Sequence, residues 1–206
     1  MTNRRKILAQ LAAGAAAVPA ITLSASEKNC ECVRPPSGPY AEYFPNVVVH
    51  THDGRKALFY HDLLRGKTVL INCMSVKNEA LYPVTANLVE VQRLLGARLG
   101  RDLFMYSLTL DPENDTPQKL HSYGAGYLGN QNPPDFSIWQ LAVGSDPEVK
   151  KIASFFGLDY RIDETNKTQI IHNLRTAVIG PDGKVVRVFP GNEWTPAQLL
   201  NELKAA

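Results

Sequence analysis

Residues 67–95 read KTVLINCMSVKNEALYPVTANLVEVQRLL, and this stretch decides the fold. Its first part, residues 67–74, is a nearly continuous apolar and β-branched run, which is typical of a buried central strand. From Pro83 onward the apolar residues recur at helical spacing. The proline suits a first helical turn, because its missing N–H would have no partner there. The stretch therefore predicts a buried strand that leads, through a short loop, into a helix over 83–99.

The segments on either side continue this alternation of strands and helices. Asp53-Gly54 is a hairpin turn signal, and Asp115 is expected to cap the helix that follows it. Strands are expected at 46–51, 56–60, 103–110, 136–143, 177–180 and 185–189, and further helices at 116–127, 146–156 and from 195 onward. This order predicts one α/β domain over 46–206, in which helices flank a mixed central sheet.

The first twenty residues resemble an export signal. Arg4 and Arg5 open a charged start, an apolar, alanine-rich run covers 7–18, and small residues permit cleavage after Ala20. The paired arginines favour the twin-arginine route, with the general route or an uncleaved anchor as alternatives. The apolar run is too short to span a bilayer comfortably, and no other segment is long and apolar enough. We therefore expect a periplasmic protein with an extended arm over 21–45 and no transmembrane segment in the mature chain.

The charge of the chain argues against nucleic acid as a partner. Residues 1–20 hold three of the 22 basic residues and none of the 20 acidic ones, so the remainder carries a formal charge of −1. A chain without a basic excess offers no attractive field for phosphate backbones or anionic lipid. Hydrophobic residues make up 44% of the chain, which is enough for an ordinary globular core.

Several blocks of the sequence, in the same order along the chain, resemble the Sco/SenC family. They are the hairpin turn 51–54, the strand 66–72, the segment 85–88, the junction 110–117 (LDPENDTP), and His172 with its spacing to the turn 180–183. The resemblance implies a thioredoxin-like fold with an added N-terminal β-hairpin. It also implies a copper site of two cysteines and one histidine that cycles between dithiol and disulfide. The implied role is copper delivery to cytochrome c oxidase, with protein partners in the assembly of that respiratory complex.

The family's metal loop has the pattern Cys-x-x-x-Cys-Pro, and this chain departs from it at both cysteines. Asn78 and Tyr82 stand at the two cysteine positions, and Pro83 is kept. Two thiols four residues apart at a helix start lie on one face, where the positive helix end lowers their pKa. An amide and a phenol are too hard to replace thiolates for Cu(I), and neither can form a disulfide. We therefore expect no cofactor at this loop, with Tyr82 packed and Asn78 capping the helix.

The resemblance carries over only His172 as a metal ligand. A single histidine near a strand start is otherwise a structural residue. A pairing of His172 with Tyr82 around Cu(II) is an alternative.

Three cysteines remain in the chain. Cys73 lies inside the predicted central strand, where it is expected to be buried as a small hydrophobe. The alternative is a relocated reactive thiol, which would need exposure and a lowered pKa. Cys30 and Cys32 lie in the arm as a pair that can chelate a soft metal or form a strained disulfide, and the arm could bring them to His172. An odd count leaves one thiol free or bonded to another chain.

These features favour a periplasmic binding or scaffolding protein in respiratory or copper-enzyme maturation. It would act without thiol turnover at positions 78 and 82. No phosphate loop, Ser-His-Asp order or zinc-ligand spacing indicates another activity, and the sequence leaves open whether the protein is an enzyme. One alternative is a thiol oxidoreductase or peroxide-reducing protein that uses Cys73 or the Cys30/Cys32 pair. Another is a copper chaperone with a site rebuilt from Cys30, Cys32 and His172.

Overall fold

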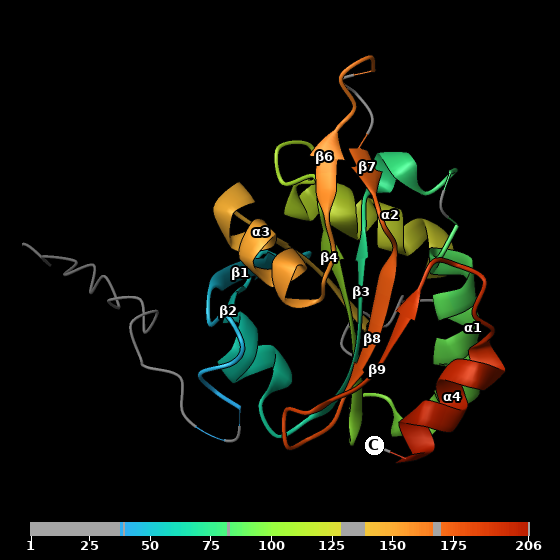
Figure 1. Cartoon of the computed structure of the whole chain (residues 1–206). Helices are drawn as coiled ribbons and strands as arrows, with labels where there is room; N and C mark the ends of the chain where they lie inside the picture. The colour runs from blue at the N-terminus through green and yellow to red at the C-terminus, as the bar shows by residue number, and fades with distance from the viewer. Residues whose placement is uncertain (1–37, 39, 82, 129–138, 167–169, 206) are drawn as a thin grey trace, which may run out of the picture. The chain divides into compact units, whose positions relative to one another are not determined.

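A seven-stranded mixed sheet forms the centre of the fold (Figure 1). The structure is a computed structural model that describes residues 38, 40–81, 83–128, 139–166 and 170–205, all of which belong to one structural unit. The strands of this sheet follow the order β2-β1-β5-β4-β3-β8-β9. The predicted α/β class, with a mixed sheet between helices, is confirmed.

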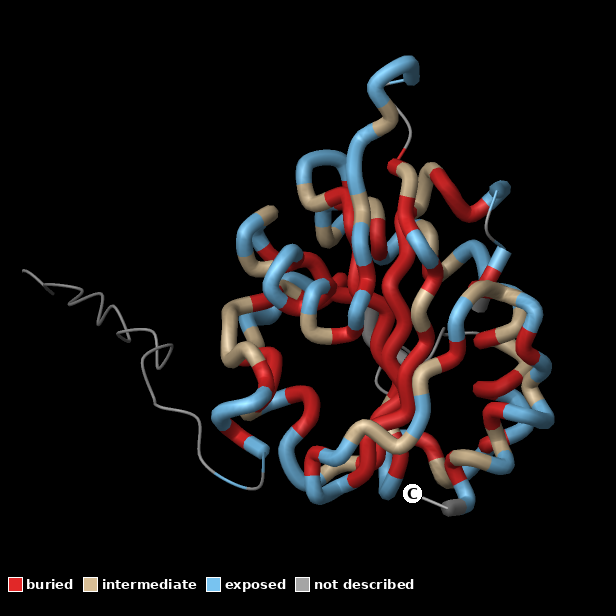
Figure 2. Tube along the Cα trace, viewed as in Figure 1, coloured by how far each residue is buried: buried red, intermediate tan, exposed pale blue. Residues whose placement is uncertain are grey.

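The strand predicted from residues 67–74 lies in the middle of the sheet. It is β3 (Thr68–Met74), and all seven of its residues are buried. β3 runs parallel to β4 (Leu103–Thr109) and antiparallel to β8 (Arg175–Ile179), and β4 runs parallel to β5 (Trp139–Gly144). Because both faces of β3 are covered, its sequence is apolar apart from Thr68 and Asn72 and shows no strict alternation. Figure 2 shows the same distribution, with the buried residues in red along the central strands.

Antiparallel hairpins extend the sheet on both sides. β1 (Val48–Thr51) pairs with β2 (Lys56–Leu58) and with β5, and β8 pairs with β9 (Val185–Pro190). The expected strand over 56–60 ends early, because a π-helical turn (Phe59–Leu64) follows Leu58 directly. Phe59 and Tyr60 both pack into the same core cluster, whereas consecutive residues of a strand would point to opposite faces.

Helices cover both faces of the sheet. α3 (Asp146–Phe155) packs on one face, α1 (Thr85–Leu95) and α4 (Pro196–Ala205) lie on the other, and α2 (Pro117–Leu128) lies beside α1 (Figure 1). Successive residues of β3 divide between the two cores. Ile71 belongs to the cluster under α3, and Leu70 belongs to the cluster under α1 and α4.

A small second sheet was not predicted. β6 (Tyr160–Ile162) and β7 (Ile170–His172) form an antiparallel pair in which Tyr160 lies opposite His172. Each strand has three residues, which is too short for an alternating pattern to identify. This pair places His172 on a strand, close to the carboxyl end of β3.

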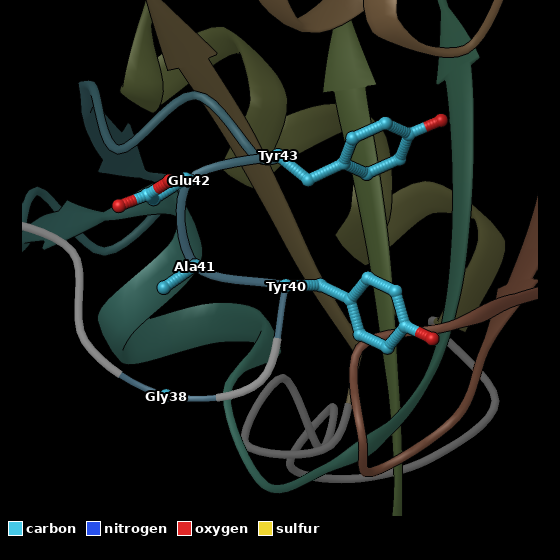
Figure 3. Close-up of a pocket in the computed structure, with 5 residues that line it drawn as sticks. All are labelled: Gly38, Tyr40, Ala41, Glu42 and Tyr43. Atoms are coloured by element: carbon cyan, nitrogen blue, oxygen red, sulfur yellow. The ribbon is translucent and has the colours of Figure 1, made fainter.

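The first described residues correct the expected arm over 21–45. Ala41 and Phe44 are buried in the core, where the Phe44 ring stacks on Tyr60 with ring centroids 5.7 Å apart. Tyr40 and Tyr43 line an open hollow and are drawn in Figure 3. This end of the arm therefore belongs to the folded domain. No helix in the described part of the chain is long and apolar enough to cross a membrane.

Candidate functional site

The loop between β3 and α1 is the candidate site, and four consecutive residues of it are bonded to different parts of the fold. The Val76 N–H donates to Asp115 Oδ2 over 3.1 Å, and the Lys77 ammonium pairs with Asp111 Oδ2 over 2.8 Å. The Asn78 amide donates to the carbonyl oxygen of Ile170 in β7. Glu79 Oε1 accepts the Thr85 N–H over 2.7 Å at the start of α1. These bonds hold the loop from three sides.

Asp115 anchors the loop from the junction between β4 and α2. Its side chain is fully buried, and it also accepts the Thr109 hydroxyl over 2.6 Å and pairs with Lys119 over 3.0 Å. The expected cap of α2 by Asp115 is wrong: Thr116 accepts the Lys119 N–H at that helix start. The buried carboxylate instead joins two strand-to-helix junctions.

Asn78 does not cap α1, which corrects the second capping expectation. Its side chain is buried, with 2% exposure, and is committed to Ile170 of β7. Glu79 accepts the first free N–H of α1 instead. Sequence reasoning missed this role of Glu79, because its distance from Thr85 matches no local capping pattern.

Glu79 belongs to a buried polar group that includes a tyrosine of α2. The Thr85 hydroxyl lies 2.6 Å from the Tyr123 hydroxyl. Burial raises the pKa of Glu79, although hydrogen bonds from Thr85 and Tyr123 oppose the shift. Burial also raises the pKa of Tyr123, so this phenol stays protonated at neutral pH. The group ties the starts of α1 and α2 together next to the loop.

Three of the candidate site residues meet at one pocket. Cys73, Asn78 and His172 all line it, and it is too narrow to hold a water molecule. Burial lowers the pKa of His172, so its imidazole is neutral at pH 7. Cys30, Cys32 and Tyr82 lie outside the described residues.

Cys73 has the environment of an inert thiol. It is buried within β3, and this burial raises the pKa of the thiol to about 12. The thiolate is the reactive form of cysteine, and at neutral pH this group is almost entirely protonated. The burial that the strand pattern predicted for Cys73 is confirmed.

The described residues around this pocket do not fit a Cu(I) site of the thiolate type. Such a site needs soft, ionised ligands, whereas the Asn78 amide is hydrogen-bonded elsewhere and the Cys73 thiol is protonated. Within the described ranges, no group of three or more histidine, cysteine, aspartate or glutamate side chains could hold a metal ion.

The fold and the site together define a thioredoxin-like protein with an added N-terminal hairpin and a strand-to-helix loop at the usual site of thiol chemistry. The chain belongs to the SCO1/SenC family, whose model matches residues 61–206. The SCO1 protein homolog of Bacillus subtilis (strain 168) is 30% identical over 148 residues, which are 69% of this chain and 72% of that protein.

Solved structures of Sco proteins show the same fold. The structure of BsSco, described as a member of the Sco family of cytochrome c oxidase assembly proteins with a disulfide switch, is 28% identical with a TM-score of 0.61. That similarity covers 77% of this chain and 89% of BsSco. Arabidopsis thaliana ScoI with copper bound is 18% identical with a TM-score of 0.62, and the similarity covers 83% of this chain and 99% of ScoI.

Proposed function

We propose that this chain is a binding or scaffolding protein in the maturation of a copper-containing respiratory enzyme, and that it acts without thiol chemistry at positions 78 and 82. Membership of the SCO1/SenC family supports the pathway, because BsSco is described as an oxidase assembly protein with a disulfide switch. We further propose that the protein works in the periplasm after removal of residues 1–20. Its partner would be a protein of the assembly pathway.

One observation carries the proposal: the side chain at a family cysteine position is a buried amide that is bonded to β7. The Asn78 amide donates to the carbonyl oxygen of Ile170, two residues from His172. A cysteine at this position would need freedom to ionise, bind a metal or reach a second sulfur. The amide instead joins the loop to the strand that carries the histidine. The loop is therefore suited to present a fixed surface.

The cysteines distinguish this proposal from its two rivals. A thiol oxidoreductase would need an ionisable thiol, and the burial of Cys73 disfavours that role. A copper chaperone with a rebuilt site would need Cys30, Cys32 and His172 together. Both rivals require at least one cysteine, whereas a scaffold requires none.

Genetic complementation with a chain that lacks cysteine tests the proposed function. Cells without this protein should lose oxidase activity, and wild-type protein should restore it. The triple variant Cys30→Ser, Cys32→Ser, Cys73→Ala should restore it equally well at matched protein levels. An inactive triple variant that is folded and abundant would favour a thiol or copper-transfer role. Unchanged oxidase activity in the deleted cells would refute the maturation role itself.

A further inference from the structure

A groove between β9 and α4 has no part in the site described above. It is open to solvent and has a volume of about 410 Å3. Its walls come from β9, from the segment before α4 and from α4 itself: Arg187, Phe189, Glu193, Trp194, Asn201 and Glu202. In Figure 1, α4 lies at the lower right, away from the β6–β7 pair at the top.

The groove contains a buried hydrogen-bond donor without an acceptor. Trp194 has only 6% of its surface exposed, and its indole Nε1 is buried with no hydrogen-bond partner among the described residues. An indole N–H can only donate. Leaving such a donor unpaired in a buried position costs free energy. Because this nitrogen is closed to solvent, a ligand carbonyl would recover that cost as the Trp194 ring turns toward the groove.

The rim of the groove carries carboxylates that the fold does not neutralise. Neither Glu193 nor Glu202 takes part in an ion pair among those found in the described part of the chain, and the same holds for Arg187. With two carboxylates and one guanidinium, the lining has a formal charge of −1. The electrostatic field of this negatively charged lining favours a cationic ligand.

The floor of the groove is aromatic. The rings of Phe189 and Trp194 lie 6.1 Å apart between centroids, and both residues are largely buried. Long basic side chains pack their methylene stems on such apolar surfaces while the charged end stays near water. A single arginine or lysine residue in a peptide complements all three features of the groove. Its apolar stem matches the aromatic floor, its cation matches the carboxylates, and its backbone carbonyl can accept the Trp194 N–H.

We propose that this groove binds an arginine or lysine residue on an exposed loop or chain end of a partner protein. The stem lies on Phe189 and Trp194, the cation reaches Glu193 and Glu202, and a peptide carbonyl accepts the Trp194 N–H. The inference stands independently of the proposed role of the β3–α1 loop.

The sheet edge beside the groove favours a side chain in the groove over an added strand. β9 forms an edge of the seven-stranded sheet. Its pairing with β8 is irregular between Val178 and Ile179, and the strand ends in Pro190. Bulges and prolines are devices that keep another strand from pairing with a sheet edge.

The test follows the indole N–H of Trp194 in 1H–15N spectra of the whole protein, assigned with the variant Trp139→Phe. The probes are the blocked tripeptides Ala-Arg-Ala, Ala-Lys-Ala and Ala-Glu-Ala. The arginine and lysine peptides should move the Trp194 signal downfield and saturate it, with Kd values on the order of 1–10 mM. The glutamate peptide should leave it in place. Glu193→Gln and Glu202→Gln should each weaken binding by up to about fivefold, while Glu113→Gln, at an exposed carboxylate outside the groove, should not.

Three outcomes would overturn the inference. The first is a Trp194 signal that does not move at about 20 mM of either basic peptide. The second is an equal response to the glutamate peptide, and the third is an unchanged affinity for the basic peptides in the double variant Glu193→Gln, Glu202→Gln. The remaining amide signals report whether each variant is folded, so loss of structure is not mistaken for loss of binding.

Discussion

Asn78 alters the chemistry of the β3–α1 loop more than any other single residue described. At the position that the resemblance to Sco/SenC proteins assigns to a cysteine, it supplies an amide, which is neutral at every accessible pH and donates to Ile170 in β7. A buried carbonyl without this partner would lose a hydrogen bond and gain no water. The residue therefore forms a fixed contact between two segments that are 92 residues apart, and on the proposed function this contact takes the place of a reactive group.

Removing this amide should lower stability. Asn78→Ala should reduce the free energy of unfolding by about 1–3 kcal/mol, because the Ile170 carbonyl stays buried without its donor. The control is Asn201→Ala, at an exposed position of α4, which should change stability by less than about 0.5 kcal/mol. Urea denaturation measures both variants. Equal stability of Asn78→Ala and the wild type would show that the amide does not hold the loop.

Cys73 should behave as a packing group. In a Cys30→Ser, Cys32→Ser background, it should react slowly with a thiol reagent in the native protein and rapidly after denaturation, because burial raises the pKa of the thiol to about 12. Cys73→Ala should cost on the order of 1 kcal/mol from lost packing. Rapid native labelling at neutral pH, together with a stable but inactive Cys73→Ser variant, would favour the thiol-enzyme alternative.

Glu79 should make stability fall as pH rises. Burial raises the pKa of Glu79 above its ordinary value of 4.5, so the folded state holds its proton to higher pH than the unfolded state does. The stability contributed by the protonated group is present below the unfolded pKa and is lost as pH rises through the folded pKa. The stability of the wild type relative to Glu79→Gln should therefore decline as pH rises above 4.5. A difference that is constant, or that grows with pH, would contradict the assignment.

At the scale of elements, segments with a clear apolar period were predictable from the sequence. Segments that are very short, or whose residues suit two kinds of structure, were not. β3 and α1 have clear apolar patterns, and both form where the sequence places them. The π-helical turn after β2 was missed because its first two residues, Phe59 and Tyr60, are aromatic residues typical of a strand. β6 and β7 were missed because three residues cannot show a period.

The junction between β4 and α2 should control the mobility of the loop. The Val76 N–H donates to the buried carboxylate that pairs with Lys119, and bonds to charged groups are stronger than neutral ones by about 1 kcal/mol. Asp115→Asn should therefore speed hydrogen exchange at Val76 by about fivefold. The Leu70 amide in the middle of β3 is the internal control and should change only as much as global stability does. Equal acceleration at both amides would mean that Asp115 supports the whole fold and not the loop in particular.

At the scale of the whole molecule, local patterns identify the class of fold but not the contacts that shape the site. The order of strands and helices, with the blocks that resemble Sco/SenC proteins, was enough to predict a thioredoxin-like sheet. The hydrogen bond from Asn78 to Ile170 joins two distant segments, and nothing in either sequence indicates that they lie side by side. The same is true of the pocket shared by Cys73 and His172, which depends on where β7 lies.

The molecule as a whole combines a family scaffold with a loop that is held in place by hydrogen bonds and ion pairs. The scaffold still brings the strand of His172 to the carboxyl end of β3. On the proposed function, replacing Asn78 and Tyr82 with cysteines should create on this scaffold the metal site that the resemblance implies. The converse also holds: the natural loop should have no high affinity for Cu(I).

Cu(I) competition against a chromophoric chelator, with stoichiometry, tests the central claim most directly. Cys30→Ser, Cys32→Ser protein with its natural loop should bind no Cu(I) tightly. Adding Asn78→Cys and Tyr82→Cys should create one tight Cu(I) site, and His172→Ala should then abolish it. The account would be contradicted if protein with the natural loop bound one Cu(I) tightly and lost it on changing Asn78→Ala and Tyr82→Ala.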